Sequence, residues 1–343
     1  MSNPYAAFDA FVRRHGGQAS FERFMADALY HPKEGYYTQH VRNIGRGGDF
    51  STSSALSPVL GEAFAHWVLA RREERFFGQP CALIELGPGN GSLMRSVTES
   101  LERRFGFSGM ELFAVETSPV FRAVLPRAVP GHRIEIFDTL KQALDACEGR
   151  ALVYSNEFPD AFPAVQLRWE EEAWQEVFLR TASGEPEEIL LSRELAYDAE
   201  APTRVREGLK LFIHASYHRW LQDNLKALRH GVMLTIDYGR FYPSSECRAY
   251  AAHQRYEDAP EIYADMGQRD VTCDVNFADL QRWGEQQGLT TNSLQPQAAF
   301  LREYVPDLET RAKEDDAVAY LSDPLGAGGA FLVLEQEKIA LDA

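Results

Sequence analysis

Apolar residues in the first 80 positions recur at helical spacing. A helix is predicted over residues 18–30, and its apolar face carries Phe21, Phe24, Met25, Ala28 and Leu29. A second helix is predicted to begin at Ser57-Pro58, because serine is a favoured N-cap and proline is tolerated in the first turn. The stretch between them, residues 31–50, is polar and glycine-rich and long enough to be a functional loop, and we expect residues 45–52 to cover the cofactor or substrate. The sequence therefore predicts a helical N-terminal region over residues 1–80.

From residue 81 onward, short apolar runs alternate with helical stretches. This pattern is typical of a parallel sheet that is covered by helices on both faces, because such strands are buried on both sides. The predicted strands lie at residues 81–86, 111–116, 133–137, 151–155, 232–237, 289–292 and 330–335. The fold class is therefore predicted to be α/β, with a seven-stranded Rossmann-like sheet within residues 81–343.

Two insertions are expected in this sheet. After the fourth predicted strand, residues 160–230 are predicted to form a hairpin over 165–179, followed by a long amphipathic helix over 204–229. After the fifth strand, residues 239–275 are polar and lack strong periodicity. Parallel sheets place substrate contacts at the carboxyl ends of their strands, so both insertions are candidates for substrate binding.

The first predicted strand ends in Glu85 and leads through Gly87, Gly89 and Gly91 into a helix. Glycines let the backbone turn tightly and let a ligand approach the free N–H groups of a helix start. The spacing is G-x-G-x-G and not the G-x-G-x-x-G of a dinucleotide site, and a carboxylate at the strand end suits a cationic aminoacyl sulfonium better than a phosphate. The alternative is a tight turn that binds nothing.

Polar side chains also follow the next three predicted strands. Glu116 ends the second, where an acidic side chain can accept both hydroxyls of a ribose, and Asp138 follows the third. Three carboxylates at successive strand ends are hard to explain as packing. Asn156 and Glu157 end the fourth strand, and a polar pair at the end of a buried strand needs a reason, although the two could simply cap the next turn.

Composition excludes several classes of function. The net charge of −16 argues against a nucleic-acid partner, because proteins normally bind nucleic acids through clustered Lys and Arg side chains. The four cysteines are far apart and form no C-x-x-C pair, so neither a metal site nor a disulfide framework is expected. No apolar run reaches the roughly 18 residues that membrane insertion needs, and no secretory or transit segment is recognised at the N-terminus. A cytoplasmic protein is therefore expected.

At these motifs the sequence resembles a family of methyltransferases that use S-adenosylmethionine. The family includes the mitochondrial complex I assembly factor that dimethylates an arginine of a complex I subunit, together with many bacterial relatives. Pro159 departs from the family, which usually carries an aromatic residue at this position. The resemblance covers residues 24–277, and its main stretches are Phe24-Met25, His31-Pro32, Gly48-Asp49-Phe50, Gly61-Glu62, Glu85 to Gly91, Asn156-Glu157-Phe158, Asp237-Tyr238-Gly239 and Asp270-Val271-Thr272.

The resemblance implies a class I methyltransferase fold with S-adenosylmethionine as cofactor. The cofactor-binding residues would be Glu85, Gly87, Gly89, Gly91, Glu116, Asp138 and Asn156. Of these, Asp138 would face the adenine. It also implies N-methylation of an arginine in a protein substrate, for example a respiratory complex subunit, and leaves the oligomeric state open. A guanidinium is always protonated and needs carboxylates to orient it. The candidates for catalysis are Glu157, Asp160, Asn156 and Asp49, with Glu62 as a further carboxylate.

Two other functions stay open at this point. Methylation of a small metabolite would require residues 239–275 to close over a compact pocket. A non-catalytic assembly factor would keep the cofactor site only as a binding module for a partner protein. The intact set of carboxylates favours catalysis over the second alternative.

Overall fold

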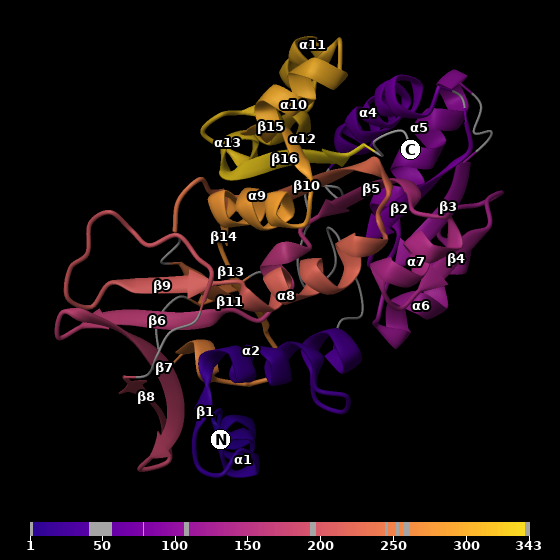
Figure 1. Cartoon of the computed structure of the whole chain (residues 1–343). Helices are drawn as coiled ribbons and strands as arrows, with labels where there is room; N and C mark the ends of the chain where they lie inside the picture. The colour runs from indigo at the N-terminus through magenta and orange to yellow at the C-terminus, as the bar shows by residue number, and fades with distance from the viewer. Residues whose placement is uncertain are drawn as a thin grey trace.

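The chain forms an α/β structure around one large twisted sheet (Figure 1). The computed structural model describes residues 3–40, 57–77, 79–105, 110–192, 197–243, 246–251, 254–256 and 261–339. The order of strands across the sheet is β15 (Thr290–Pro296), β16 (Phe331–Lys338), β10 (His230–Arg240), β5 (Arg150–Asn156), β2 (Cys81–Leu86), β3 (Met110–Val115) and β4 (Ile134–Phe137). Strand β16 runs antiparallel to both of its neighbours, β15 and β10, and the other neighbouring strands are parallel to each other. The predicted strand positions fall on these strands, and the predicted α/β class is confirmed.

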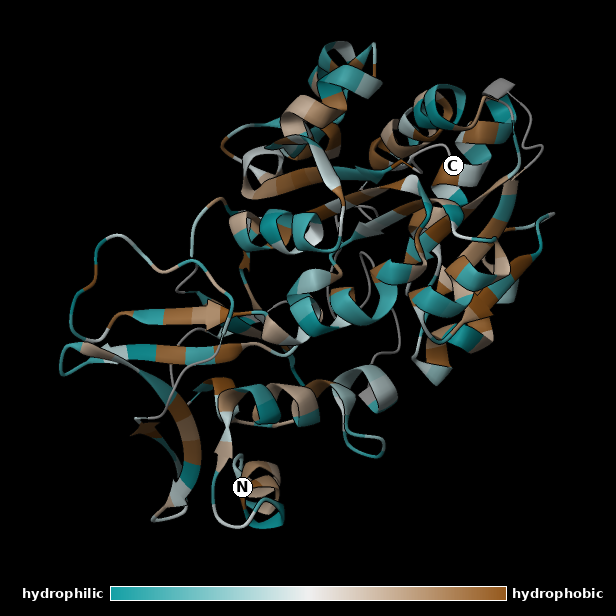
Figure 2. Cartoon of the chain, viewed as in Figure 1, coloured by the Kyte–Doolittle hydropathy of each residue, from teal (hydrophilic) through white to brown (hydrophobic). Residues whose placement is uncertain are grey.

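Helices cover both faces of the sheet, as the apolar runs predicted. Along β2, the side chains of Ala82, Ile84 and Leu86 enter one core cluster, whereas Cys81 and Leu83 enter another. The first cluster lies under α7 (Leu140–Ala146), α8 (Ala215–Asn224) and α9 (Phe277–Gln286). The second lies under α4 (Val59–Phe76), α5 (Ser92–Phe105) and α10 (Gln297–Tyr304). In Figure 2 the exposed turns of α8 and α9 are teal, which marks the polar faces that these helices turn to solvent.

The remaining elements around the sheet are short. Helix α6 (Pro119–Val124) follows β3, and α11 (Leu308–Glu314), α12 (Asp316–Ser322) and α13 (Ala327–Ala330) lead into β16. The two-residue strand β14 (Val275–Asn276) pairs with the end of β10. No helix in the described ranges is both long and apolar enough to cross a membrane.

The first insertion builds a second, antiparallel sheet. It consists of β6 (Val165–Glu170), β7 (Ala173–Ala182), β8 (Glu185–Leu191) and β9 (Lys210–Ile213), and β1 (Ala19–Ser20) from the N-terminal region pairs with β7. The predicted hairpin is confirmed by the pairing of β6 with β7. The long helix predicted over residues 204–229 is wrong, because β9 occupies its first half and only α8 is helical. Leu211, Phe212 and Ile213 are buried on both faces of β9, and a short apolar run of this kind has no period that separates strand from helix.

The second insertion is also more regular than the sequence suggested. It forms a three-stranded antiparallel sheet of β12 (Gln254–Tyr256), β11 (Cys247–Ala251) and β13 (Asp270–Cys273). The expectation that residues 239–275 lack periodicity is wrong, because β11 and β13 alternate strictly between two environments. One face carries Cys247, Ala249, Val271 and Cys273, which are buried in a third core cluster. The other face is polar and carries Arg248, Tyr250, Asp270 and Thr272.

The N-terminal region packs on this third cluster (Figure 1). Helix α2 (Phe21–Tyr30) confirms the first predicted helix, and Ser20 caps it by accepting the N–H of Arg23. Helix α1 (Ala6–Arg14) was not predicted. The cluster gathers aromatic rings from both helices and from the second insertion, namely Phe8, Phe11, Phe21, Phe24 and Tyr263. The division of the chain at residue 80 stays a prediction.

Candidate functional site

A pocket of about 920 Å³ lies at the carboxyl ends of the parallel strands. Its walls come from the turn after β2, the ends of β3, β5 and β10, the π-helical turn η1 (Tyr36–His40) and the polar face of β11 and β13. The crevice outside the carboxyl ends of such strands is where open α/β sheets bind ligands. The polar residues predicted at the strand ends, Glu85, Glu116, Asp138 and Asn156, therefore lie together at one edge of the sheet.

The glycine turn after β2 forms the floor of the pocket with its backbone. Gly87 and Gly89 have φ of 60° and 54°, a conformation that side-chain-bearing residues rarely adopt. A Cβ at Gly87 would lie 2.7 Å from Cδ2 of Phe158, and one at Gly91 would lie 2.6 Å from Cβ of Ala128. Positions 87 and 91 thus require glycine, which fits a backbone cradle that a ligand approaches closely.

Glu85 lies at the end of β2 with only 3% of its surface exposed. It accepts a hydrogen bond of 2.8 Å from the hydroxyl of Tyr154. Burial, opposed by this bond and assisted by the negative charge of Glu116, raises the pKa of Glu85 from 4.5 to about 8. A positive charge placed beside Glu85 would therefore be favourable, as the sequence anticipated for a cationic ligand.

The raised pKa of Glu85 makes a prediction for stability. The folded-state pKa exceeds the unfolded-state value, so the contribution of Glu85 to stability is complete below about pH 4.5 and is lost as the pH rises through about 8. Glu85→Gln keeps the shape and removes the titration. We expect the ligand-free variant to be more stable than wild type at pH 9, by up to about 5 kcal/mol, with little difference at pH 5. Chemical unfolding from pH 5 to 9 measures this, and a variant less stable than wild type at pH 9 would contradict it.

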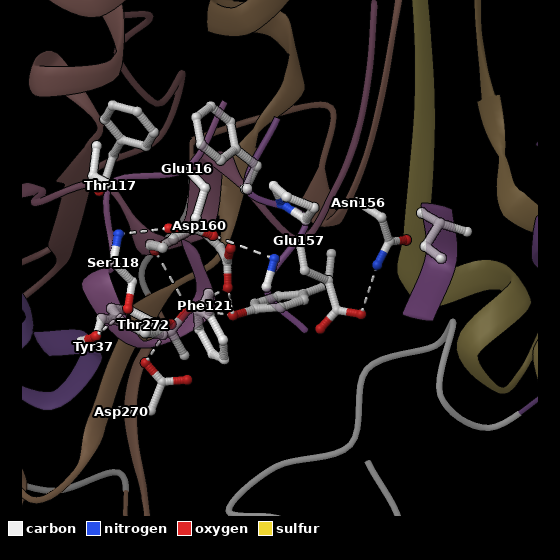
Figure 3. A pocket seen from close by; sticks show the side chains of 18 of the residues that line it. Tyr37, Glu116, Thr117, Ser118, Phe121, Asn156, Glu157, Asp160, Asp270 and Thr272 are labelled. Carbon is white, nitrogen blue, oxygen red and sulfur yellow. Dashed lines mark hydrogen bonds between the residues drawn. The ribbon is translucent and has the colours of Figure 1, made fainter. Parts of the chain in front are cut away.

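Glu116 and Asp138 follow β3 and β4 and both line the pocket. Glu116 is buried and accepts the backbone N–H of Ser118 at 2.8 Å and that of Gly89 at 3.3 Å, one at each oxygen (Figure 3). Burial raises the pKa of Glu116. Each oxygen keeps further acceptor capacity, which suits a pair of hydroxyls. Asp138 is 68% exposed and pairs with Arg122 at 2.8 Å.

Asn156 ends β5, Glu157 follows it directly, and both line the pocket. Glu157 has a φ of 54°, which is costly for a residue with a side chain, and its N–H donates to the carbonyl of Ile236 at 2.9 Å. Nδ2 of Asn156 donates to Oε1 of Glu157 at 3.1 Å (Figure 3). Backbone strain of about 1–3 kcal/mol that is maintained at a pocket wall points to a functional position.

Asp160 belongs to the 3₁₀ turn η3 (Pro159–Ala161) and is 7% exposed. Its Oδ2 accepts Oγ1 of Thr272 at 3.0 Å and the hydroxyl of Tyr238, while its N–H donates to Oδ2 of Asp237 at 3.1 Å. Its Oδ1 is enclosed and has no hydrogen-bond partner among the described residues. Burial raises the pKa of Asp160, and burial followed by the charge of Asp160 raises that of Asp237. The network fixes Asp160 firmly at the edge of the pocket.

Two further carboxylates, Asp49 and Glu62, were expected at the substrate. Asp49 and the rest of the glycine-rich loop over residues 45–52 lie outside the described residues. Glu62 lies on α4, does not line the pocket and accepts a hydrogen bond from Nη1 of Arg311 at 2.7 Å, so the structure does not bring it together with the other carboxylates. Arg311 is close to Glu62 only because α11 packs beside α4, which the sequence gave no means of seeing.

Several pocket residues carried no functional assignment from the sequence. Among them are Tyr30, Tyr37, Tyr238, Asp270 and Thr272. The rings of Tyr30 and Tyr37 stack at 5.6 Å, and the Tyr37 hydroxyl donates to Oδ1 of Asp270 at 2.9 Å. The available signal was the alternation of polar and apolar residues over Asp270 to Cys273, which is typical of a strand with one polar face.

Known relatives give this pocket a context. The chain is 26% identical over 305 residues to the protein named "Protein arginine methyltransferase NDUFAF7 homolog, mitochondrial" of Drosophila melanogaster. The matched region covers 79% of this chain and 68% of the relative. It is 25% identical over 321 residues to the zebrafish (Danio rerio) protein named "Protein arginine methyltransferase NDUFAF7, mitochondrial", covering 83% of this chain and 73% of the relative. These relatives are mitochondrial proteins, so the cytoplasmic location expected from the sequence is contradicted.

The same fold occurs in a crystal structure from Burkholderia thailandensis that is bound to S-adenosyl-homocysteine. The two chains superpose with a TM-score of 0.81 at 22% identity, over 99% of this chain and 93% of the other. A second structure from that organism gives a TM-score of 0.80. The model of the family described as "Putative S-adenosyl-L-methionine-dependent methyltransferase" matches residues 59–295, which include the glycine turn, the acidic strand ends and both insertions. The chain therefore belongs to this family of methyltransferases, with S-adenosylmethionine as its cofactor.

Proposed function

We propose that this methyltransferase modifies a guanidinium nitrogen of an arginine in a protein substrate. The observation that carries the proposal is the position of Glu157, whose strained backbone holds a carboxylate in the wall of the pocket that the glycine turn also lines. A guanidinium keeps its charge at any physiological pH and is held best by carboxylates that match its fork of donors. The names of the curated relatives, which are called protein arginine methyltransferases, agree with this chemistry.

The pocket residues fit the cofactor in size and chemistry. In this proposal the backbone of Gly87 and Gly89 receives the cofactor, and Glu85 and Asn156 lie toward its cationic aminoacyl part. Gly91, which does not line the pocket, lets the turn pack against Ala128. Glu116 accepts the ribose hydroxyls with the acceptor capacity that its two backbone bonds leave. Asp138, at the end of the next strand, borders the adenine. When bound, S-adenosylmethionine supplies an electrophilic methyl group.

The protein's own residues would orient the nitrogen that attacks. Glu157 holds the positive charge on part of the guanidinium, so that the remaining nitrogen keeps electron density for attack. Asp160 adds negative charge at the edge of the pocket, and hydrogen bonds from Tyr238 and Thr272 hold it in place. As the new N–C bond forms and the S–C bond breaks, the methylated nitrogen loses one proton, which Glu157 accepts. Positioning of this kind supplies up to about 7–11 kcal/mol in well-oriented systems.

An experiment with labelled cofactor tests the proposal. The purified protein is incubated with S-adenosylmethionine that carries a tritiated methyl group and with a lysate of the parent organism. We expect the label in a protein band and, after acid hydrolysis, in methylated arginine. Purified subunits of the respiratory complexes are the first defined substrates to test, as the resemblance suggests. Label in a small molecule would instead support metabolite methylation, and label in another amino acid would contradict the arginine assignment.

The ribose assignment makes a separate prediction. Glu116→Ala is expected to weaken binding of S-adenosyl-homocysteine by about 1–3 kcal/mol, because a charged hydrogen-bond partner is lost. This corresponds to roughly 5- to 150-fold in the dissociation constant. Calorimetric titration measures the change, with the exposed Glu99→Ala on α5 as control. Equal affinities for wild type and Glu116→Ala would reject the assignment.

A further inference from the structure

We propose that Asp270, on the second insertion, is a substrate-binding carboxylate that holds the guanidinium together with Glu157. The inference rests on the proposed arginine methylation and extends it by naming a second charged group that contacts the substrate. Two carboxylates on different walls would define the plane of the guanidinium, which one carboxylate leaves free to rotate.

The strand carrying Asp270 turns a polar face to the pocket. On β11 and β13, the pocket face carries Arg248 opposite Thr272 and Tyr250 opposite Asp270. The opposite face, with Val271 and Cys273, is buried against the N-terminal helices. Asp270 therefore points toward the pocket because of the strand register, and the packing behind it holds it there.

Asp270 is a buried acid without a cation. Only 8% of its surface is exposed, and no Lys, Arg or His side chain forms an ion pair with it within the part of the chain that the structure describes. Among the described residues, its carboxylate accepts one hydrogen bond, the 2.9 Å bond from Tyr37 to Oδ1. Figure 3 shows the second carboxylate oxygen turned away from Tyr37. A buried charge of this kind is costly unless it meets an opposite charge, which a cationic substrate would supply.

Arg240, Arg248 and Arg255 also line the pocket, but the charge that acts most on Asp270 is the negative charge of Asp160, which favours a cationic ligand at this point. Burial, followed by the negative charge of Asp160, raises the pKa of Asp270 to about 7, against which the hydrogen bond from Tyr37 acts. The two acids differ in access, because Oδ2 of Asp160 already accepts two hydroxyls and Oδ1 is enclosed. Asp160 is therefore a positioning residue in this proposal, and Asp270 is the one that contacts the substrate.

Tyr37 and Tyr30 form the wall next to Asp270. Their stacked rings line the pocket, and Tyr30 donates its hydroxyl to the carbonyl of Ala161 at 2.8 Å. An aromatic face beside a carboxylate suits a flat cation, because a guanidinium stacks on the ring while its edge meets the carboxylate. The Tyr37 bond fixes the carboxylate in that orientation.

The test uses two synthetic probes and needs no natural substrate. One is an adenosine whose 5′-alkyl chain ends in a guanidine, and the other carries the same chain ending in a hydroxyl group. Calorimetry gives the affinity of each probe and of S-adenosyl-homocysteine. We expect wild type to prefer the guanidine probe by at least about tenfold, on the scale of one charged hydrogen-bond pair. Asp270→Asn should lower affinity for the guanidine probe by at least about tenfold and leave the other two ligands within about twofold.

Two further variants keep the result interpretable. Asp223→Asn, at an exposed position of α8, makes the same chemical change outside the pocket and should bind all three ligands as wild type does. Tyr37→Phe removes only the donor to Asp270, and we expect a smaller loss, about threefold, for the guanidine probe alone.

The outcomes separate the two proposals. If wild type does not prefer the guanidine, the proposed function fails. If wild type prefers it and Asp270→Asn keeps the preference, the role of Asp270 fails while the proposed function stands. A loss in Asp270→Asn that is equal for all three ligands would show a structural role and would also overturn the inference.

Discussion

Glu157→Gln is expected to bind S-adenosylmethionine with near-wild-type affinity and to transfer its methyl group at least about a hundredfold more slowly. The substitution keeps the size and shape of the side chain and can still accept the bond from Asn156. It removes the negative charge that the guanidinium requires, and that charge matters most as the nitrogen attacks. The loss should therefore appear in turnover and not in cofactor affinity.

Tritium transfer into protein, measured beside calorimetric titration of the cofactor, separates these two effects. Glu99→Gln makes the same change at an exposed position of α5 and should match wild type in both. Full activity in Glu157→Gln would reject the catalytic assignment and leave Asp160 and Asp270 as the carboxylates to test. Loss of cofactor binding would instead place Glu157 among the cofactor ligands.

Gly89→Val is expected to abolish detectable binding of S-adenosylmethionine while the protein stays folded. Gly89 has a φ of 54°, lines the pocket and donates its N–H to Glu116. A branched side chain there would occupy the space that the cofactor needs and would tilt the backbone away from Glu116. We expect the dissociation constant of the cofactor to rise by more than about a hundredfold. The side chain fills space that the cofactor needs, and the backbone N–H of Gly89 loses its orientation.

Gly184→Val is a matched control for the backbone strain. Gly184, in the turn between β7 and β8, also has a positive φ, and a Cβ there would meet nothing within 4 Å. Both variants should lose a similar amount of stability in thermal unfolding, and only Gly89→Val should lose the cofactor. Calorimetry that finds unchanged affinity in Gly89→Val would remove the cofactor assignment of the turn.

The sheet and its cofactor edge could be predicted because their signals are local. Each parallel strand is a short run buried on both faces, and Glu85, Glu116 and Glu157 stand directly at or after such a run. The direction of the strands then brings these side chains to one edge without further information. The glycine turn is equally local, since its conformation excludes other residues over a few positions.

The substrate side of the pocket depends on pairings that no local pattern reveals. Tyr37 and Asp270 are 233 positions apart, and the bond between them exists only because η1 and β13 meet. Strand β9 was taken for helix because it is buried on both faces, which erased its alternation. Strand β13 was missed for the opposite reason, since one polar face made its segment resemble a loop.

The two faces of β11 and β13 also connect the pocket with the N-terminal helices, and this connection affects how the pocket evolves. Val271 and Cys273 lie in the third core cluster beside α1 and α2, while their neighbours Asp270 and Thr272 line the pocket. A change of side-chain volume in that cluster must therefore move residues that bind the substrate. Selection on substrate choice then acts on Phe8 or Phe24 as well, and we expect the lineages of this family that changed their substrate to have altered both faces together.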